Sequence, residues 1–222
     1  MFFESSKTKG DLDMDNILKT GTTTIGIVCK DCIVLGADKR ATAGNFIANK
    51  NVEKVVPISD YMALTTAGTV SDIQLLIKLI KAELKLKEIR SNQKPSVKEG
   101  ANLLAGMVFS NIRKMSMIPG ISHFLVGGYD DEKHLYDLYP DGSISDVEDF
   151  VSSGSGSVMA YGVLETNYKE NMSEEEGINL TMKALNAAIQ RDSASGEGID
   201  IFVIDKKGIR LALKKKINTK LT

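Results

Sequence analysis

Histidine and cysteine, on which many metal sites and nucleophilic enzymes depend, are scarce in this chain. Its 222 residues include two histidines, His123 and His134, and two cysteines, Cys29 and Cys32. A zinc site would need a second cysteine pair or histidines close to the Cys-x-x-Cys spacing. Neither histidine lies in a recognisable nucleophile motif, so we expect both to be surface or hydrogen-bonded core residues. The sequence therefore argues against a metal enzyme and against a Ser-His-Asp or Cys-His hydrolase.

The cysteine pair also lacks the surroundings of a redox motif. A redox-active Cys-x-x-Cys is expected near a strand that runs into a helix, whereas apolar strands are predicted on both sides of this one. We interpret Cys29 and Cys32 as residues beside a hairpin turn at Lys30-Asp31.

Long hydrophobic runs and an excess of one charge are absent as well. The formal net charge is -1 at pH 7, with 42% hydrophobic and 26% charged residues, as in ordinary soluble domains. No apolar run approaches the ~18 residues of a membrane span, and the N-terminus lacks the pattern of a secretory signal. We expect a cytoplasmic protein with no membrane span and no general affinity for nucleic acid.

The predicted elements come as strands, two helices, strands, two helices and strands. This grouped order, without strict βαβ alternation, indicates one α+β domain in which sheets are stacked between helix layers. Ser96 with Glu99, and Ser173 with Glu176, predict capping boxes at two helix starts. A basic, solvated tail is expected from Lys214. Strands are expected over residues 22–29, 33–38, 46–56, 61–66, 123–129, 134–139, 199–204 and 209–213. Four helices are expected: one after Thr69 that ends near residue 90, and others over about 96–112, 158–168 and 173–190.

The stretch Gly21-Thr22-Thr23-Thr24 separates a polar leader, residues 1–20, from the first convincing strand. A threonine hydroxyl is a weak nucleophile until a base removes its proton. A free α-amine titrates near pH ~8 and can be that base, but only when nothing is attached to the nitrogen. We therefore predict that Thr22 becomes the N-terminal nucleophile of a hydrolase after cleavage at Gly21. The alternative is that three threonines simply begin a β-strand.

A buried carboxylate and a nearby lysine are candidate partners of that nucleophile. Asp38 ends an apolar strand and therefore requires a partner, which Lys54 on a neighbouring strand can supply. The charge of an ion-paired lysine favours deprotonation of a nearby hydroxyl. Arg40 is a second possible partner for Asp38. An ordinary structural salt bridge is the alternative.

Further candidates lie where helices meet loops. Gly68, at a switch from strand to helix, lets the backbone approach a substrate, and its N–H can serve an oxyanion hole. The short side chains of Ser155, Asp192 and Ser195 can orient the new amine. A plain turn glycine, and capping or turn residues, are the alternatives.

Taken together, these motifs resemble the proteasome β-subunits of the archaeal type over almost the whole chain after residue 21. Each motif is weak alone, and the six in this order are specific. They are Gly21-Thr22-Thr23-Thr24, Gly36-Ala37-Asp38-Lys39-Arg40 with Lys54 sixteen residues after Asp38, Thr66-Ala67-Gly68, Gly154-Ser155-Gly156-Ser157, Tyr161-Gly162-Val163-Leu164-Glu165, and Arg191-Asp192-Ser193-Ala194-Ser195-Gly196.

The resemblance implies a four-layer αββα sandwich of the N-terminal nucleophile hydrolase type. Residues 1–21 would be a propeptide removed by autocatalysis, and residues 22–222 a single catalytic domain. Thr22 would be the nucleophile, tuned by Asp38 and Lys54, with Ser155, Asp192 and Ser195 positioning its amine. The backbone of Thr42, Gly68 and Val70 would align the substrate as an added strand, with Gly68 holding the oxyanion. The specificity pocket would draw on Ala41, Val52, Val56, Thr66 and Val70.

The resemblance also implies an assembly and a substrate. A seven-membered β-ring would stack with a second one between rings of α-subunits, giving a 28-subunit α7β7β7α7 barrel. An ATP-dependent unfoldase ring would dock on the α-subunits and feed in unfolded proteins, whose peptide bonds are hydrolysed without a metal or organic cofactor. Thr66 is smaller and more polar than the residue expected for a chymotrypsin-like preference.

Two alternatives remain at this point. One is another amidohydrolase with an N-terminal nucleophile, including the bacterial two-ring ATP-dependent peptidase. The other is a non-catalytic scaffold β-subunit, which should lack the threonine, the lysine or the processing glycine. This chain retains Thr22, Lys54 and Gly21.

Overall fold

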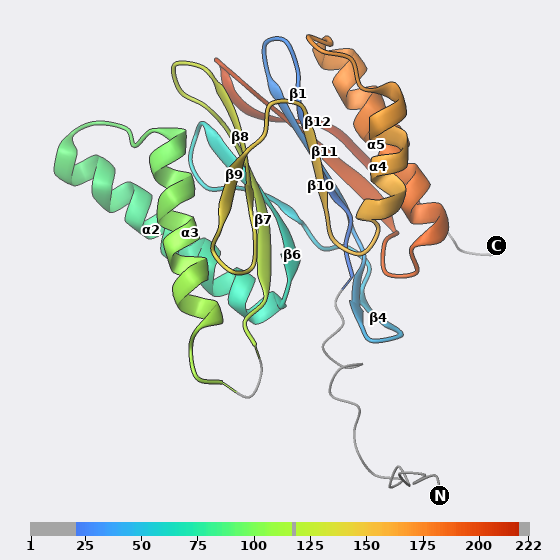
Figure 1. Cartoon of the computed structure of the whole chain (residues 1–222), viewed down its shortest axis with the longest axis horizontal. Helices are drawn as coiled ribbons and strands as arrows, with labels where there is room; N and C mark the ends of the chain where they lie inside the picture. Colours follow the sequence, from blue (N-terminus) through green and yellow to red (C-terminus); the bar gives the residue numbers. More distant parts are fainter. Residues whose placement is uncertain (1–20, 117–118, 218–222) are drawn as a thin grey trace, which may run out of the picture.

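The computed structural model describes residues 21–116 and 119–217, which form two β-sheets stacked face to face between two pairs of helices (Figure 1). The predicted leader, residues 1–20, lies outside the described residues. The first sheet has the strand order β10-β1-β2-β11-β12, and all its pairs are antiparallel. Its strands are β1 (Thr24–Val28), β2 (Ile33–Asp38), β10 (Phe150–Ser153), β11 (Gly198–Asp205) and β12 (Gly208–Lys216).

The second sheet has the order β5-β6-β7-β8-β9 and is also antiparallel. A separate hairpin of β3 and β4 projects beside the start of β1. The strands of the second sheet are β5 (Val55–Pro57), β6 (Met62–Gly68), β7 (Ser122–Tyr129), β8 (Lys133–Leu138) and β9 (Ile144–Asp146), and the hairpin strands are β3 (Ala41–Ala43) and β4 (Phe46–Asn49).

Each sheet is covered by one pair of helices. Helices α2 (Val70–Ser91) and α3 (Val97–Ile112) cover the second sheet, and α4 (Ser157–Asn167) and α5 (Glu174–Arg191) cover the first (Figure 1). Both predicted capping boxes are present, at Ser96 before α3 and at Ser173 before α5. None of the helices in the described ranges combines the length and the hydropathy needed to cross a lipid bilayer.

Three hydrophobic clusters hold the layers together. One lies between α2, α3 and the second sheet, another between α4, α5 and the first sheet, and the third between the two sheets. Successive side chains of β1 point to opposite faces of the sheet. Ile25 and Ile27 face α4 and α5 and are fully buried, while Val28 packs against the cluster between the two sheets. Burial of one such side chain stabilises the fold by about 1.5–3 kcal/mol. The predicted α+β sandwich is therefore confirmed.

Several predicted boundaries were wrong. The strand expected over 46–56 is divided into β4 and β5, because β4 pairs with β3 in the separate hairpin and β5 pairs with β6 in the second sheet. The short strands β3, β9 and β10 were not predicted. The basic residues from Lys214 were expected in a solvated tail, and they are indeed exposed, but β12 continues through Lys216.

Candidate active site

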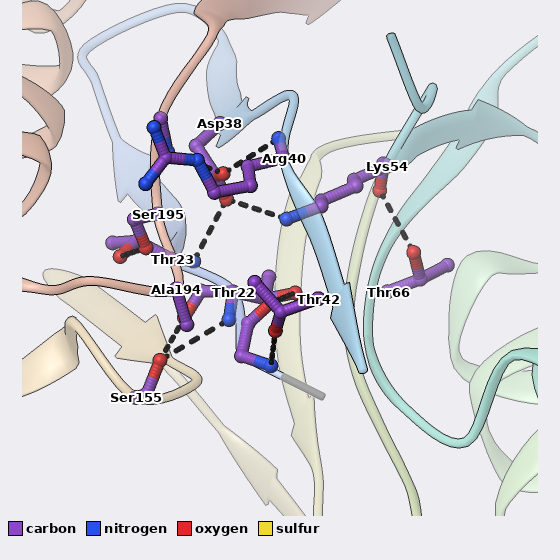
Figure 2. Close-up of polar contacts among 12 residues, drawn as sticks. Thr22, Thr23, Asp38, Arg40, Thr42, Lys54, Thr66, Ser155, Ala194 and Ser195 are labelled. Atoms are coloured by element: carbon purple, nitrogen blue, oxygen red, sulfur yellow. Dashed lines mark hydrogen bonds and ion pairs between the residues drawn. The ribbon is translucent and has the colours of Figure 1, made fainter. Parts of the chain in front are cut away.

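Thr22 lies two residues before β1 and directly follows Gly21. The residue is buried, with 6% of its surface exposed. Its Oγ1 donates a hydrogen bond to the Gly21 carbonyl oxygen at 2.7 Å, and its N–H donates to Ser155 Oγ at 3.2 Å (Figure 2). The hydroxyl therefore lies beside the carbonyl group at which the predicted cleavage occurs.

Gly21 is packed so closely that no side chain would fit. A β-carbon on it would lie 1.9 Å from Ala194 Cβ and 2.8 Å from Ser155 Oγ, both far inside van der Waals contact. The Gly21 N–H donates to Thr42 Oγ1 at 3.1 Å, so its position is fixed from two sides. Thr42 was predicted to bind substrate through its backbone, and here its hydroxyl contacts the residue before Thr22.

Asp38, at the end of β2, is the centre of a buried hydrogen-bond network. Its Oδ1 accepts from Lys54 Nζ at 2.7 Å and from Thr23 N–H at 3.0 Å, and its Oδ2 accepts from Arg40 N–H and Gly196 N–H, both at 2.9 Å (Figure 2). The carboxylate is 1% exposed, and these four donors offset its loss of hydration. The predicted pairing of Asp38 with Lys54 is confirmed.

Lys54 is buried beside this carboxylate. Burial lowers the pKa of its ammonium below the ordinary value of a lysine, although the charge of Asp38 and its hydrogen bond oppose the shift. Lys54 and Asp38 nevertheless form a buried ion pair, with 4% and 0% of their side chains exposed.

Arg40 is not the second charged partner of Asp38 that the sequence suggested. Only its backbone N–H bonds that carboxylate. Its guanidinium turns toward the segment after α5, where it pairs with Glu197 Oε1 at 3.1 Å and donates to the Ser193 carbonyl oxygen at 2.8 Å. Arg40 therefore stabilises the loop after α5, which contains Ser195.

The three residues predicted to hold the amine form one hydrogen-bonded chain. Asp192, at the C-terminal end of α5, accepts through Oδ2 from Ser155 Oγ at 2.7 Å and from Ser195 Oγ at 2.6 Å. Ser195 Oγ lies 2.7 Å from Thr23 Oγ1. Since Ser155 also accepts from the Thr22 N–H, the chain ends at the nitrogen that cleavage would free.

Gly68 occupies the end of β6, two residues before α2 begins, as predicted. Its φ of +125° lies in the region that favours glycine, and a β-carbon there would lie 2.2 Å from the Ile121 carbonyl oxygen. Glycine is therefore required at this strand-to-helix switch, and its backbone borders the same cavity as Thr22.

A cavity of about 470 Å³ joins Thr22, Lys54 and Gly68. All five residues predicted for the specificity pocket line it: Ala41, Val52, Val56, Thr66 and Val70. Their part in substrate choice stays a prediction. Sequence reasoning missed the face of α2 that also lines the cavity, although its spacing of three and four residues from Val70 was a usable signal. The missed residues are Glu53 and, on α2, Ile73, Gln74, Ile77 and Lys78.

His123 forms a hydrogen-bonded link between the sheets. Its Nδ1 lies 2.8 Å from Ser153 Oγ on β10, and its Nε2 lies 2.5 Å from Asp137 Oδ1 on β8. Ser153 is 3% exposed and pairs with Thr24 in the first sheet, so this arrangement is a satisfied structural contact. Within residues 21–116 and 119–217, no cluster of histidine, cysteine, aspartate and glutamate is suited to hold a metal ion.

The family and the relatives reported next are all described as proteasome subunits. The family described as "Proteasome subunit" matches residues 18–204. "Proteasome subunit beta 2" of Ignicoccus hospitalis is 49% identical over 86% of this chain and 88% of that protein. "Proteasome subunit beta" of Methanocaldococcus vulcanius is 42% identical over 90% of this chain and 89% of its own length. The protein of the same name from Picrophilus torridus is 42% identical, with coverage of 92% and 96%.

Proposed function

This chain belongs to the proteasome subunit family as a β-subunit of the 20S core, and we propose that it is a catalytic threonine endopeptidase that activates itself. The observation that carries the proposal is the 2.7 Å contact between Thr22 Oγ1 and the Gly21 carbonyl oxygen, inside a site bounded by Lys54, Asp38 and Ser155. A scaffold subunit would have no need of this arrangement.

The first reaction is removal of the leader. Thr22 Oγ1 attacks the Gly21 carbonyl carbon, the Gly21–Thr22 amide bond breaks, and an ester to the threonine oxygen replaces it. Water then hydrolyses the ester and leaves a free α-amine. Before cleavage the threonine nitrogen is an amide and cannot act as a base, so the hydroxyl proton passes to a water, while the charge of Lys54, held by its ion pair with Asp38, favours the alkoxide.

The second reaction is hydrolysis of a substrate peptide by the same hydroxyl. The new amine accepts the Thr22 proton, directly or through a water, and the Ser155–Asp192–Ser195 chain holds that amine in place. The charge of Lys54 lowers the cost of forming the alkoxide. Gly68 N–H stabilises the oxyanion, a contribution typically worth 10²–10³-fold in kcat.

The substrate is an unfolded protein whose residue before the cut enters the 470 Å³ cavity. Apolar walls formed by Val52, Val56 and Ile77 favour an apolar side chain of moderate size, while Thr66 leaves the pocket wider than a bulky residue would. We further propose the cytoplasm as the site of action. Seven-membered β-rings would stack between α-subunit rings, and an ATP-dependent unfoldase would supply the substrate.

The test is the intact mass of the subunit after coexpression with a proteasome α-subunit. Wild type and Thr22→Ser, which keeps a hydroxyl, should lose residues 1–21, while Thr22→Ala should retain them. Peptide hydrolysis should be present in the first two and absent from the third. Retention of the leader by wild type in fully assembled particles, or cleavage at another bond, would overturn the proposal and favour a scaffold role.

A further inference from the structure

The closed end of the β1–β2 hairpin holds two thiols that the proposed reaction does not use. Cys29 and Cys32 are both free and buried, with 1% and 3% of their surfaces exposed. Although the pair does not lie where a strand runs into a helix, as expected of a redox-active Cys-x-x-Cys, we propose that it is a site of reversible oxidation, in which a peroxide converts the two thiols into a Cys29–Cys32 disulfide.

The backbone already places the two residues at a suitable separation. Cys29 N–H donates to the Cys32 carbonyl oxygen at 2.9 Å, so the pair continues the antiparallel ladder beyond Val28 and Ile33. Hydrogen-bonded antiparallel partners have Cα atoms about 5.5 Å apart, and disulfides span Cα separations of about 4.4–6.8 Å. Directly opposite residues in such a ladder lie on the same face of the sheet, with Cβ atoms about 4.5–5.5 Å apart. A small side-chain movement is therefore enough to bring the sulfurs into bonding range.

Neighbouring elements hold the hairpin end in this position. Lys30 N–H donates to the Met172 carbonyl oxygen at 2.9 Å, and Lys133 Nζ donates to the Lys30 carbonyl oxygen at 2.6 Å. Cys29 Sγ packs against the first turn of α5, where a β-carbon on Gly177 would lie only 2.3 Å away. These contacts fix the backbone of the hairpin end, so little conformational entropy is lost when the two sulfurs join.

The two thiols are not equivalent. Cys32 lines a cavity of about 710 Å³ whose walls carry both lysines, such as Lys206, and carboxylates, such as Glu174, and a molecule of the size of peroxide has room beside the thiol. The contact with Cys29 lowers the pKa of the Cys32 thiol, and the contact with Cys32, together with burial, raises the pKa of Cys29. Cys32 is the thiol that borders this cavity, so it reacts first and Cys29 resolves the product.

The reaction balances with peroxide as the oxidant. The Cys32 thiolate attacks one peroxide oxygen, the O–O bond breaks, and a sulfenic acid and hydroxide form. Cys29 sulfur then attacks the sulfenic sulfur and displaces its oxygen as water, while the thiol protons end on the departing oxygens. Two thiols and one hydrogen peroxide thus give one disulfide and two waters, and a dithiol reductant reverses the change.

The experiment treats the assembled wild-type particle with hydrogen peroxide, unfolds it in an alkylating agent and measures the intact mass of the subunit. Wild type should lose the mass of two hydrogens and take up no alkyl group, then take up two after reduction. Peptide mapping should place the bond between Cys29 and Cys32. The matched control Cys29→Ala should instead give a sulfenic acid trapped by dimedone, and Cys32→Ala should react at least ~10-fold more slowly.

The result does not depend on the proposed peptidase mechanism, because mass and not activity is measured. The hairpin also lies at the end of β1 remote from Thr22. A variant with both Cys29→Ala and Cys32→Ala should therefore assemble and hydrolyse peptides like wild type. Two free thiols after treatment of the native particle, oxidation of Cys32 to a sulfinic acid, or a disulfide between subunits would each overturn the proposal.

Discussion

The fit of Gly21 against Ala194 gives a sharp prediction about self-activation. In Gly21→Ala the added β-carbon would lie 1.9 Å from Ala194 Cβ, whereas apolar carbons pack at about 3.5–4.0 Å. The Gly21 carbonyl or the Ala194 loop must therefore move by roughly 1.6 Å or more. Since a misplacement of about 1 Å costs on the order of 10²-fold in rate, we expect leader removal to slow at least ~100-fold, or about 2.7 kcal/mol in activation free energy.

The assay follows the mass of the subunit over time after the particle assembles. Native gel electrophoresis should show that Gly21→Ala assembles, because the added methyl group affects a residue outside the main hydrophobic clusters. Ala194→Gly should process normally. The double variant Gly21→Ala, Ala194→Gly should recover part of the rate of leader removal. Its second substitution removes Ala194 Cβ, while Ser155 Oγ still lies 2.8 Å from the new methyl group.

Two results would refute the reasoning. Removal of the leader from Gly21→Ala at the wild-type rate would mean that the close packing around Gly21 does not position its carbonyl. Equal rates for Gly21→Ala and the double variant would show that Ala194 is not the obstacle, since double-variant cycles detect coupling between residues in contact.

Other sites give further predictions. Lys54→Ala should assemble but hydrolyse a fluorogenic peptide about 10²–10⁴-fold more slowly, and near-normal turnover would remove the lysine from the mechanism. Gly68→Ala should lower kcat about 10²–10³-fold, because the added β-carbon displaces the backbone at the predicted oxyanion hole; a change in KM alone would contradict this. Hydrogen bonds from Lys87 and Ser96 lower the pKa of Glu99, so its stabilising effect should be full above pH ~4.3 and be lost as pH falls through the lower folded value. The melting temperature of Glu99→Gln should therefore approach that of wild type in acid and fall below it at neutral pH.

Local patterns in the sequence were sufficient to predict the main helices and the longer strands. The capping boxes at Ser96 and Ser173 depend on residues three positions apart, so no tertiary information was needed. The strands β9 and β10 contain three and four residues, too few for an alternating pattern to stand out. Likewise, the segment around Asn51 looked continuous with its flanking strands, because its division depends on pairing with other strands, β3 for β4 and β6 for β5.

The candidate site shows the same division between local and tertiary information. Asp38 and Lys54 were paired correctly, because a carboxylate at the end of a buried strand requires a charged or hydrogen-bonding partner. Arg40 met the same chemical requirement, yet its guanidinium bonds Glu197, which lies far away in the sequence. Residue type identified Lys54 and Arg40 as candidate charged partners of Asp38, and only the fold could show which of the two side chains bonds it.

The position of Asp38 explains why the site is rigid before any substrate arrives. Three of its four donors are backbone N–H groups, and they come from different segments of the chain: Thr23 just before β1, Arg40 after β2 and Gly196 before β11. A backbone donor has no rotamer to fix, so holding the carboxylate costs side-chain entropy for Asp38 but none for these three donors. Lys54 is the one donor on a side chain, and the Asp38 carboxylate that accepts from it is held in place by the three backbone donors. The fold therefore preorganises the charge next to Thr22 through its backbone, and a sequence does not display backbone contacts of this kind.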